Sequence, residues 1–189
     1  MGQGHGRNVI DELVSDHREI EELFGRIEAL PPGAADRKRY ADRATTELVR
    51  HSVAEEECLH PSVRERVPGG DALADTELDD HARAEQIMKD LEGRAADDPE
   101  FDRLVGMLMR EIRTHLADEE RDLFPRLRAA CPAVILDGLG DKVRKARKTA
   151  PTRPHPSAPD EPPADRTLAP GAGLVDRMRD AMTGRGKPY

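Results

Sequence analysis

The sequence predicts an all-α protein, built as an up-down-up-down four-helix bundle with a short C-terminal extension. Three observations predict this fold. Apolar side chains recur at three- and four-residue steps along four long segments. Breaks rich in Pro and Gly separate these segments. The first pair of segments is also repeated in the second pair, because a shift of 64 residues carries His51 onto His115 and Glu55 onto Glu119.

The composition narrows the class of protein. The 189 residues suffice for one bundle and a tail, and the net charge of −8 gives no basic footprint for nucleic acid. The chain has no Trp, which favours amphipathic helices over a large aromatic core. No apolar run approaches the roughly 20 residues that span a membrane, and the N-terminus lacks the apolar core of a signal peptide. We therefore expect a cytoplasmic protein that binds neither nucleic acid nor membrane.

The first expected helix covers residues 8–30, with Asn8 as its N-cap. His17 lies within its apolar stripe, and the Pro-Pro-Gly break at 31–33 ends the helix. The second expected helix begins near Asp36 and carries both His51 and Glu55 on one face.

Pro61 lies inside the second helical pattern, so we expect a kink or an early end near residue 60. The third helix is expected from Asp71 to about residue 91. The fourth follows the Asp-Asp-Pro cap at 97–99, and in it Pro125 repeats Pro61.

The C-terminal extension begins with a short fifth helix at about 132–148, weakened by Gly138 and Gly140. We expect residues 1–148 to form the bundle domain with this helix. The Pro-rich stretch 149–172 is predicted to be an extended, disordered linker. The tail at 173–189 carries one short amphipathic pattern.

Spacing places four histidines in one layer of the bundle. Residues at equal distances from a turn between antiparallel helices lie at the same height. The midpoints of consecutive histidines are residues 34, 66 and 98, each at or next to an expected break. All four also lie on inward stripes, and they are His17, His51, His81 and His115.

The same layer carries carboxylates. Residues i and i+4 share a helix face, so Glu55 points with His51 and Glu119 points with His115. Imidazole and carboxylate suit iron, manganese or zinc. Two six-coordinate ions need about twelve ligand positions. Four imidazoles, two bridging carboxylates and an oxide or hydroxide bridge would leave about two positions open for dioxygen, peroxide or nitric oxide.

The chain resembles the hemerythrin-like, or HHE cation-binding, family over roughly residues 8–130. The residues that carry the resemblance are Asp16-His17, His51-x-x-x-Glu55, Asp80-His81, His115-x-x-x-Glu119 and Leu123-Phe124-Pro125. The resemblance implies a bundle around two non-haem iron ions joined by an oxo or hydroxo bridge. Its motif implies six metal ligands, which are His17, His51, Glu55, His81, His115 and Glu119.

The sequence departs from the oxygen-carrying hemerythrins at two ligands. These have a second His four residues after the third-helix His, where this chain has Glu85, and an Asp five residues after the last His, where Glu119 and Glu120 compete. More carboxylate favours oxidised iron. We therefore expect peroxidase-like, catalase-like or nitric-oxide-handling chemistry, or iron handling, rather than reversible oxygen carriage. The alternative is an iron or oxygen sensing or storage module without turnover.

Several neighbouring residues have two interpretations. Glu85 and Glu120 are either direct ligands or outer partners of the ligands, and the outer role is favoured for both. His60 is expected at the surface unless Pro61 turns it inward. Cys58 is expected to pack in the core, with a redox role as the alternative.

Overall fold

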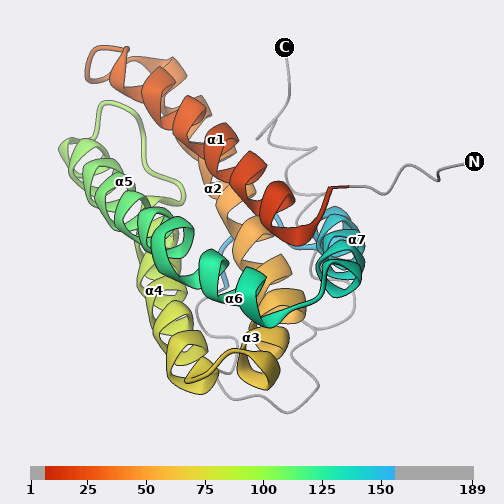
Figure 1. Ribbon diagram of the computed structural model, residues 1–189. Coiled ribbons are helices and arrows are strands. Elements are labelled where there is room, and N and C mark those ends of the chain that lie inside the picture. Colours follow the sequence, from red (N-terminus) through yellow and green to blue (C-terminus); the bar gives the residue numbers. More distant parts are fainter. Residues whose placement is uncertain (1–6, 156–189) are drawn as a thin grey trace, which may run out of the picture.

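The computed structural model describes residues 7–155, and every regular element in this range is a helix. Figure 1 shows their arrangement. The elements are α1 (Val9–Glu28), α2 (Ala35–Ala54), η1 (Glu55–Leu59), α3 (His60–Arg66), α4 (Gly70–Leu91), α5 (Pro99–Asp118), η2 (Glu119–Leu123), α6 (Phe124–Ala130) and α7 (Ala133–Thr149). The predicted all-α class is thus confirmed for this range, while the predicted tail helix lies outside it.

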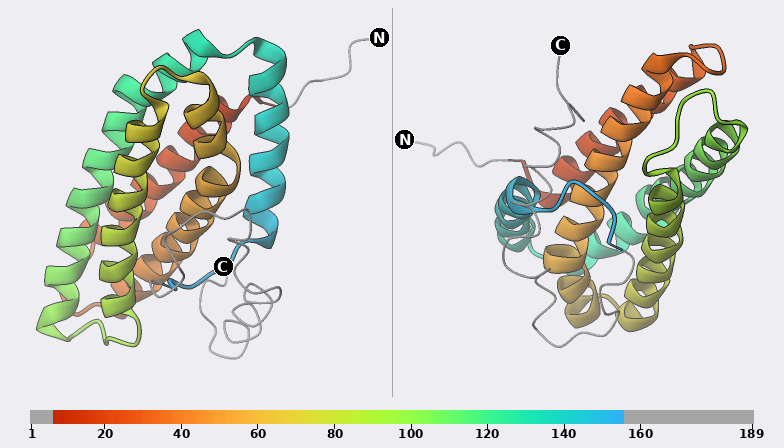
Figure 2. Two further views of the ribbon diagram at one scale, coloured as in Figure 1. Left: turned by 90° about the horizontal axis from the view of Figure 1, so that it is seen from below. Right: turned by 180° about the vertical axis from the view of Figure 1, so that it is seen from behind.

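Four long helices, α1, α2, α4 and α5, run alongside one another. Helices α1 and α2 form one packed pair, and α4 and α5 form the other. Helix α7 lies outside these four and packs against α1 and α2, as the views in Figure 2 show. In the described part of the chain, no helix is both long and apolar enough to cross a membrane.

Local signals place the helix ends as expected. The Asn8 side chain accepts hydrogen bonds from the backbone N–H groups of Ile10 and Asp11, at 3.0 and 3.2 Å, and so caps α1. Asp98 accepts from the N–H of Glu100 at 2.9 Å and caps α5. These bonds satisfy donors that have no partner inside a helix.

The core has two apolar clusters with a polar layer between them. One cluster joins α1, α2, α4 and α5 towards the loops at 29–34 and 92–98. The other joins the start of α1 to α3, α6 and α7. The four histidines of the expected layer belong to neither cluster and are buried between them. The apolar clusters thus enclose a polar interior.

A π-helical turn lies where a kink or an early end of the helix was expected near residue 60. Helix α2 continues through η1 into α3, and the His60 N–H bonds to the carbonyl of Glu55, five residues earlier. The second half repeats this at η2, just before Pro125. A wider turn relieves the clash that a proline ring makes in a regular α-helix, and such turns often occur at functional sites.

The π turn also corrects the expected position of His60. This side chain is buried, with 3% of its surface exposed, and is not at the surface. One extra residue in the turn rotates the following residues by about 100°. That rotation carries His60 inward, which is the alternative allowed for a turn near Pro61, whereas the favoured surface position assumed regular α-helical steps.

The first residues after α7 are packed, although the sequence predicts an extended linker from residue 149. Residues 150–154 are buried. Arg153 pairs at 2.6 Å with Glu92, the C-cap residue of α4, and the backbone N–H of His155 donates to Glu85 of α4 at 2.7 Å. We call residues 150–155 the strap. Residues 156–189 lie outside the described range, so the other predicted boundaries there stay predictions.

Candidate metal centre

The four histidines lie close together, as their spacing predicts. The ring centroids of His17 and His51 are 5.1 Å apart, and those of His81 and His115 are 5.0 Å apart. All four side chains are buried, with at most 7% of the surface exposed. They come from α1, α2, α4 and α5. Each long helix therefore contributes one imidazole to one layer.

Glu55 lies between imidazoles from the two repeated halves. Its Oε2 atom is 3.3 Å from Nε2 of His51 and 3.3 Å from Nε2 of His81. His51 belongs to the first half and His81 to the second. This is the position that a carboxylate bridging two metal ions would need.

Glu119 occupies the corresponding position from the second half. Its Oε2 atom is 3.3 Å from Nε2 of His17 and 3.6 Å from Nε2 of His115. The same oxygen is 4.0 Å from Nε2 of His51. The two glutamates, both fully buried, thus join all four imidazoles into one cluster.

The inward atoms of this cluster fit a metal. The Nε2 atoms of the four histidines and both carboxylates of Glu55 and Glu119 have no hydrogen-bond partner among residues 7–155. A buried polar group without a partner costs about 1–3 kcal/mol, and more if it is charged. Ligand atoms of His17, His51, Glu55 and Glu119 lie within 4.8 Å of one another, and so do those of Glu55, His81 and His115. Cations held by both sets would satisfy these atoms.

The outward nitrogens of two histidines are held by paired glutamates. Nδ1 of His17 donates to Glu120 at 2.8 Å, and Nδ1 of His81 donates to Glu56 at 3.0 Å. The shift of 64 residues relates Glu56 to Glu120. A carboxylate on Nδ1 fixes the ring and leaves Nε2 free for a metal. Glu56 was missed in the sequence, although its match to Glu120 in the repeat could have identified it.

The other two histidines face aspartates. Nδ1 of His51 is 3.6 Å from Asp16, and Nδ1 of His115 is 3.5 Å from Asp80. His115 has a second carboxylate, Glu77, at 3.1 Å. The repeat could not reveal Glu77, because the shifted position is a leucine. All four histidines therefore present Nε2 inward and Nδ1 to an outer carboxylate.

The buried charges shift the pKa values of the cluster. Burial lowers the pKa of His81, but the close carboxylate of Glu55 and the hydrogen bond to Glu56 outweigh this and raise it to about 9. Burial raises the pKa of Glu55, and the charge of Glu119 raises it further. Burial would also raise the pKa of Glu119, yet the charge of His115 and the close imidazole of His17 lower it. Metal binding must therefore displace protons held among these groups.

The residues with two interpretations lie outside the inward cluster. Glu85 accepts the N–H of His155, and burial raises its pKa. Glu120 bonds to Nδ1 of His17 and to Arg18, on the outer side of the ring. Cys58 is a free, half-buried thiol packed against the second apolar cluster, and burial raises its pKa. The geometry gives Glu85 and Glu120 outer positions and makes Cys58 a poor nucleophile.

Two more rings cover the histidine layer. His60 stacks on His81, with ring centroids 5.5 Å apart, and Phe124 stacks on His17 at 5.6 Å. The repeat relates these two pairs. Burial, followed by the charge of His81, lowers the pKa of His60 to about 3. His60 is thus a neutral ring in the place that Phe124 fills in the other half.

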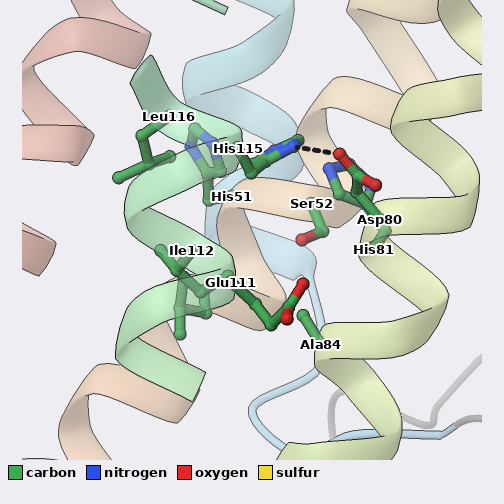
Figure 3. Close-up of a pocket in the computed structure, with 10 residues that line it drawn as sticks. His51, Ser52, Asp80, His81, Ala84, Glu111, Ile112, His115 and Leu116 are labelled. Carbon is green, nitrogen blue, oxygen red and sulfur yellow. Dashed lines mark ion pairs between the residues drawn. The ribbon is translucent and has the colours of Figure 1, made fainter. Parts of the chain in front are cut away.

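A small cavity lies beside the layer, and Figure 3 shows its lining. Its polar side includes His51, His81 and His115, and the ion pair between His115 and Asp80 lies at its edge. Its remaining lining is largely apolar, and consists of Leu48, Ala84, Ile112 and Leu116 together with Ser52 and Glu111. The cavity is large enough for about one water-sized molecule.

Comparisons with known proteins agree with this geometry. The family model described as the hemerythrin HHE cation binding domain matches residues 8–127. An uncharacterized hemerythrin-like protein of Schizosaccharomyces pombe is 24% identical over 175 residues, which are 92% of this chain and 86% of that protein. A crystal structure of a hemerythrin HHE cation binding domain-containing protein from Mycobacterium kansasii is similar in fold, with a TM-score of 0.66 and 19% identity. That similarity covers 76% of this chain and 86% of the other.

Proposed function

The chain belongs to the hemerythrin HHE cation-binding domain family, and from that premise we propose that it is a non-haem di-iron protein that handles dioxygen, peroxide, nitric oxide or iron. Membership implies that the domain binds cations. The observation that carries the proposal is the buried set of unpaired nitrogen and carboxylate atoms between the two apolar clusters. Four imidazoles and two carboxylates are ligands that suit iron.

The ligand assignment follows from which atoms face inward. We propose that each histidine binds through Nε2 and that Glu55 and Glu119 each bridge the two ions. The distances from Glu55 to His51 and His81, and from Glu119 to His17 and His115, support this assignment. When bound, the two irons supply redox chemistry and open positions for a small molecule. We further propose that the four long helices act as an up-down-up-down bundle that keeps these ligands in one layer.

The surrounding residues orient the ligands and exclude water. Outer carboxylates such as Glu56 and Glu120 hold the Nδ1 atoms, so that the rings present Nε2 at fixed angles. The rings of His60 and Phe124 cover two of the imidazoles. The small cavity beside His51 and His115 has room for about one water-sized molecule next to the imidazoles. This arrangement supports dioxygen, peroxide and nitric oxide as the partners.

We propose redox turnover as the activity, with peroxidase-like, catalase-like or nitric-oxide-handling chemistry. The carboxylate-rich surroundings support it, because negative charge around a metal favours its oxidised state. The second candidate is an iron or oxygen sensing or storage module without turnover, which the enclosed and buried cluster also favours. We also propose that the protein works in the cytoplasm, without nucleic acid or membrane partners, given its net charge of −8.

Peroxide consumption by the iron-reconstituted protein separates the two candidates. The protein is mixed with an excess of hydrogen peroxide, once alone and once with an excess of an organic electron donor, because peroxidase-like turnover needs a reductant whereas catalase-like dismutation does not. The peroxide is followed over time together with the iron spectrum. Removal of many equivalents per chain, with the spectrum restored afterwards, supports turnover. Consumption that stops near one equivalent, or iron release, would favour storage or sensing. The Glu119→Ala variant, treated with iron in the same way, controls for iron bound elsewhere.

A further inference from the structure

Helix α7 reaches the histidine layer through one arginine. Arg147 pairs with Oδ1 of Asp16 on α1, and its second nitrogen is 3.1 Å from Glu47 on α2. Asp16 is buried, with 4% of its surface exposed, and its other oxygen is 3.6 Å from Nδ1 of His51. A line of contacts therefore runs from α7, outside the four long helices, to an inward-facing imidazole.

The corresponding pair in the second half of the repeat, Asp80 and His115, has different neighbours. Asp80 approaches His115 as Asp16 approaches His51, but its arginine partner is Arg83 of the same helix, whose side chain is 58% exposed. His115 also has Glu77 at 3.1 Å, where the first half has a buried leucine at position 13. His51 thus faces one carboxylate, Asp16, which is paired with the half-buried Arg147. His115 faces two carboxylates, of which Asp80 is paired with the more exposed Arg83.

This difference changes what each imidazole offers a metal. An outer carboxylate raises the basicity of the histidine that it contacts. A carboxylate already bound to a guanidinium accepts more weakly from a second donor, because the two donors compete for its charge. His51 should therefore be a weaker electron donor than His115. The two aspartates lie at nearly equal distances from their imidazoles, 3.6 Å for Asp16 and 3.5 Å for Asp80, so the added carboxylate on His115 is Glu77, at 3.1 Å.

We propose that Arg147 is a positioning residue of the metal centre, which acts through Asp16 on His51 and makes the two metal positions electronically different. The inference rests on the proposed di-iron function. It assigns to α7 a role that the matched domain, residues 8–127, does not include. The residue touches no proposed ligand itself and acts only by holding Asp16.

Three variants of α7 test the role of Arg147. Arg147→Ala breaks the contact with Asp16, and Arg147→Lys keeps a cation there. Arg144→Ala is the matched control, because Arg144 also ties α7 to α1, through Glu12 at 2.6 Å and the carbonyl of Arg7 at 2.9 Å. If α7 docking alone matters, Arg144→Ala and Arg147→Ala should change the metal centre equally. If the contact from Arg147 through Asp16 to His51 matters, only Arg147→Ala should change it.

The readouts are the Mössbauer spectrum of protein carrying ⁵⁷Fe and iron retention against a chelator. We expect two quadrupole doublets of equal area in the wild type. Arg147→Ala should shift one doublet and weaken iron retention about 10-fold, the lower end of the effect of outer partners. Arg147→Lys should restore most of both signals, and Arg144→Ala should leave both at wild-type values.

Two results overturn the inference without touching the proposed function. One is a single doublet in wild-type protein that holds two irons per chain. The other is an Arg147→Ala spectrum and retention equal to those of Arg144→Ala. Wild-type protein that holds no iron pair after reconstitution would contradict the proposed function itself, and the inference with it. Helicity measured by circular dichroism shows that all variants are folded.

Discussion

At the residue scale, the two nitrogens of each histidine have different tasks. Nε2 faces the interior, where Glu55 and Glu119 lie, and Nδ1 faces an outer carboxylate. Glu120 and Glu56, the outer carboxylates of His17 and His81, are partly exposed, whereas the two inner glutamates are fully buried. A buried carboxylate without a hydrogen-bond partner is costly. That cost is the physical reason to assign metal binding to Glu55 and Glu119 and orientation to Glu56 and Glu120.

Adjacent glutamates on the last long helix should therefore differ sharply on mutation. Glu119→Ala removes the carboxylate that lies near His17 and His115, so the iron pair and its spectrum should be lost. His115→Ala, which removes one terminal nitrogen, should weaken the centre less. Glu120→Ala removes an outer partner and should cost no more than about 10- to 100-fold in metal affinity. Iron content and near-ultraviolet absorption measure all three.

Helicity of each variant is the control for folding. Loss of the di-iron spectrum in Glu120→Ala, with its retention in Glu119→Ala, would show that the ligand assignment on this helix is wrong by one residue. The glutamate at the repeated position, Glu55, would then also need to be reassigned.

At the element scale, periodicity predicts most of the helices and the histidine layer. The apolar steps and the equal distances from the turns depend only on regular helical geometry, which α1, α2, α4 and α5 follow. The π turns η1 and η2 break that regularity, so regular helical steps favour the wrong, surface position for His60. The sequence repeat also gives no information on where α7 packs. Helix α7 has no counterpart in the repeat, and its contact with Asp16 is purely tertiary.

Alanine substitutions at two glycines of α7 should have opposite effects on the free energy of unfolding. A Cβ at Gly140 would lie 2.4 Å from the carbonyl oxygen of Arg7, a backbone atom that cannot move aside cheaply, whereas nothing lies within 4 Å of a Cβ at Gly138. Gly140→Ala should therefore lower the free energy of unfolding by about 1–3 kcal/mol. Gly138→Ala should raise it by up to about 1 kcal/mol, through helix propensity. Urea unfolding of the metal-free protein measures both, and equal effects would contradict the close approach of α7 to α1.

At the scale of the whole molecule, the C-terminal part continues the fold beyond the matched family domain. Helix α7 contacts both α1 and α2. The strap then passes to α4, where Arg153 and His155 contact Glu92 and Glu85. The Pro-rich composition predicted an extended segment, and composition alone cannot show that such a segment is packed. The strap ties α7 to the second half of the repeat.

The ion pair of the strap predicts a pH dependence. Burial would raise the pKa of Glu92, but hydrogen bonds from Lys89 and Arg153 lower it to about 2, against an ordinary value of 4.5. Ionised Glu92 therefore stabilises the fold above about pH 4.5, and this contribution is lost as the pH falls towards 2. At pH 7, Glu92→Gln should lower the free energy of unfolding by about 1 kcal/mol, and by less at pH 3.

Urea unfolding of the metal-free protein at both pH values provides the measurement. Arg153→Ala should show a smaller effect of the same sign, because Lys89 still pairs with Glu92 at 2.7 Å after Arg153 is removed. A difference between wild type and Glu92→Gln that stays constant from pH 7 to pH 3 would rule out this role of the pair.

Iron stoichiometry with an optical spectrum tests the central claim most directly. The full-length protein is reconstituted with iron under reducing conditions, exposed to air, freed of loosely bound metal, and analysed for metal per chain. Four imidazoles and two bridging carboxylates predict two irons per chain, with near-ultraviolet charge-transfer absorption from a bridged, oxidised pair. A reconstituted sample that holds one zinc ion, or no metal, and lacks this absorption would contradict the account.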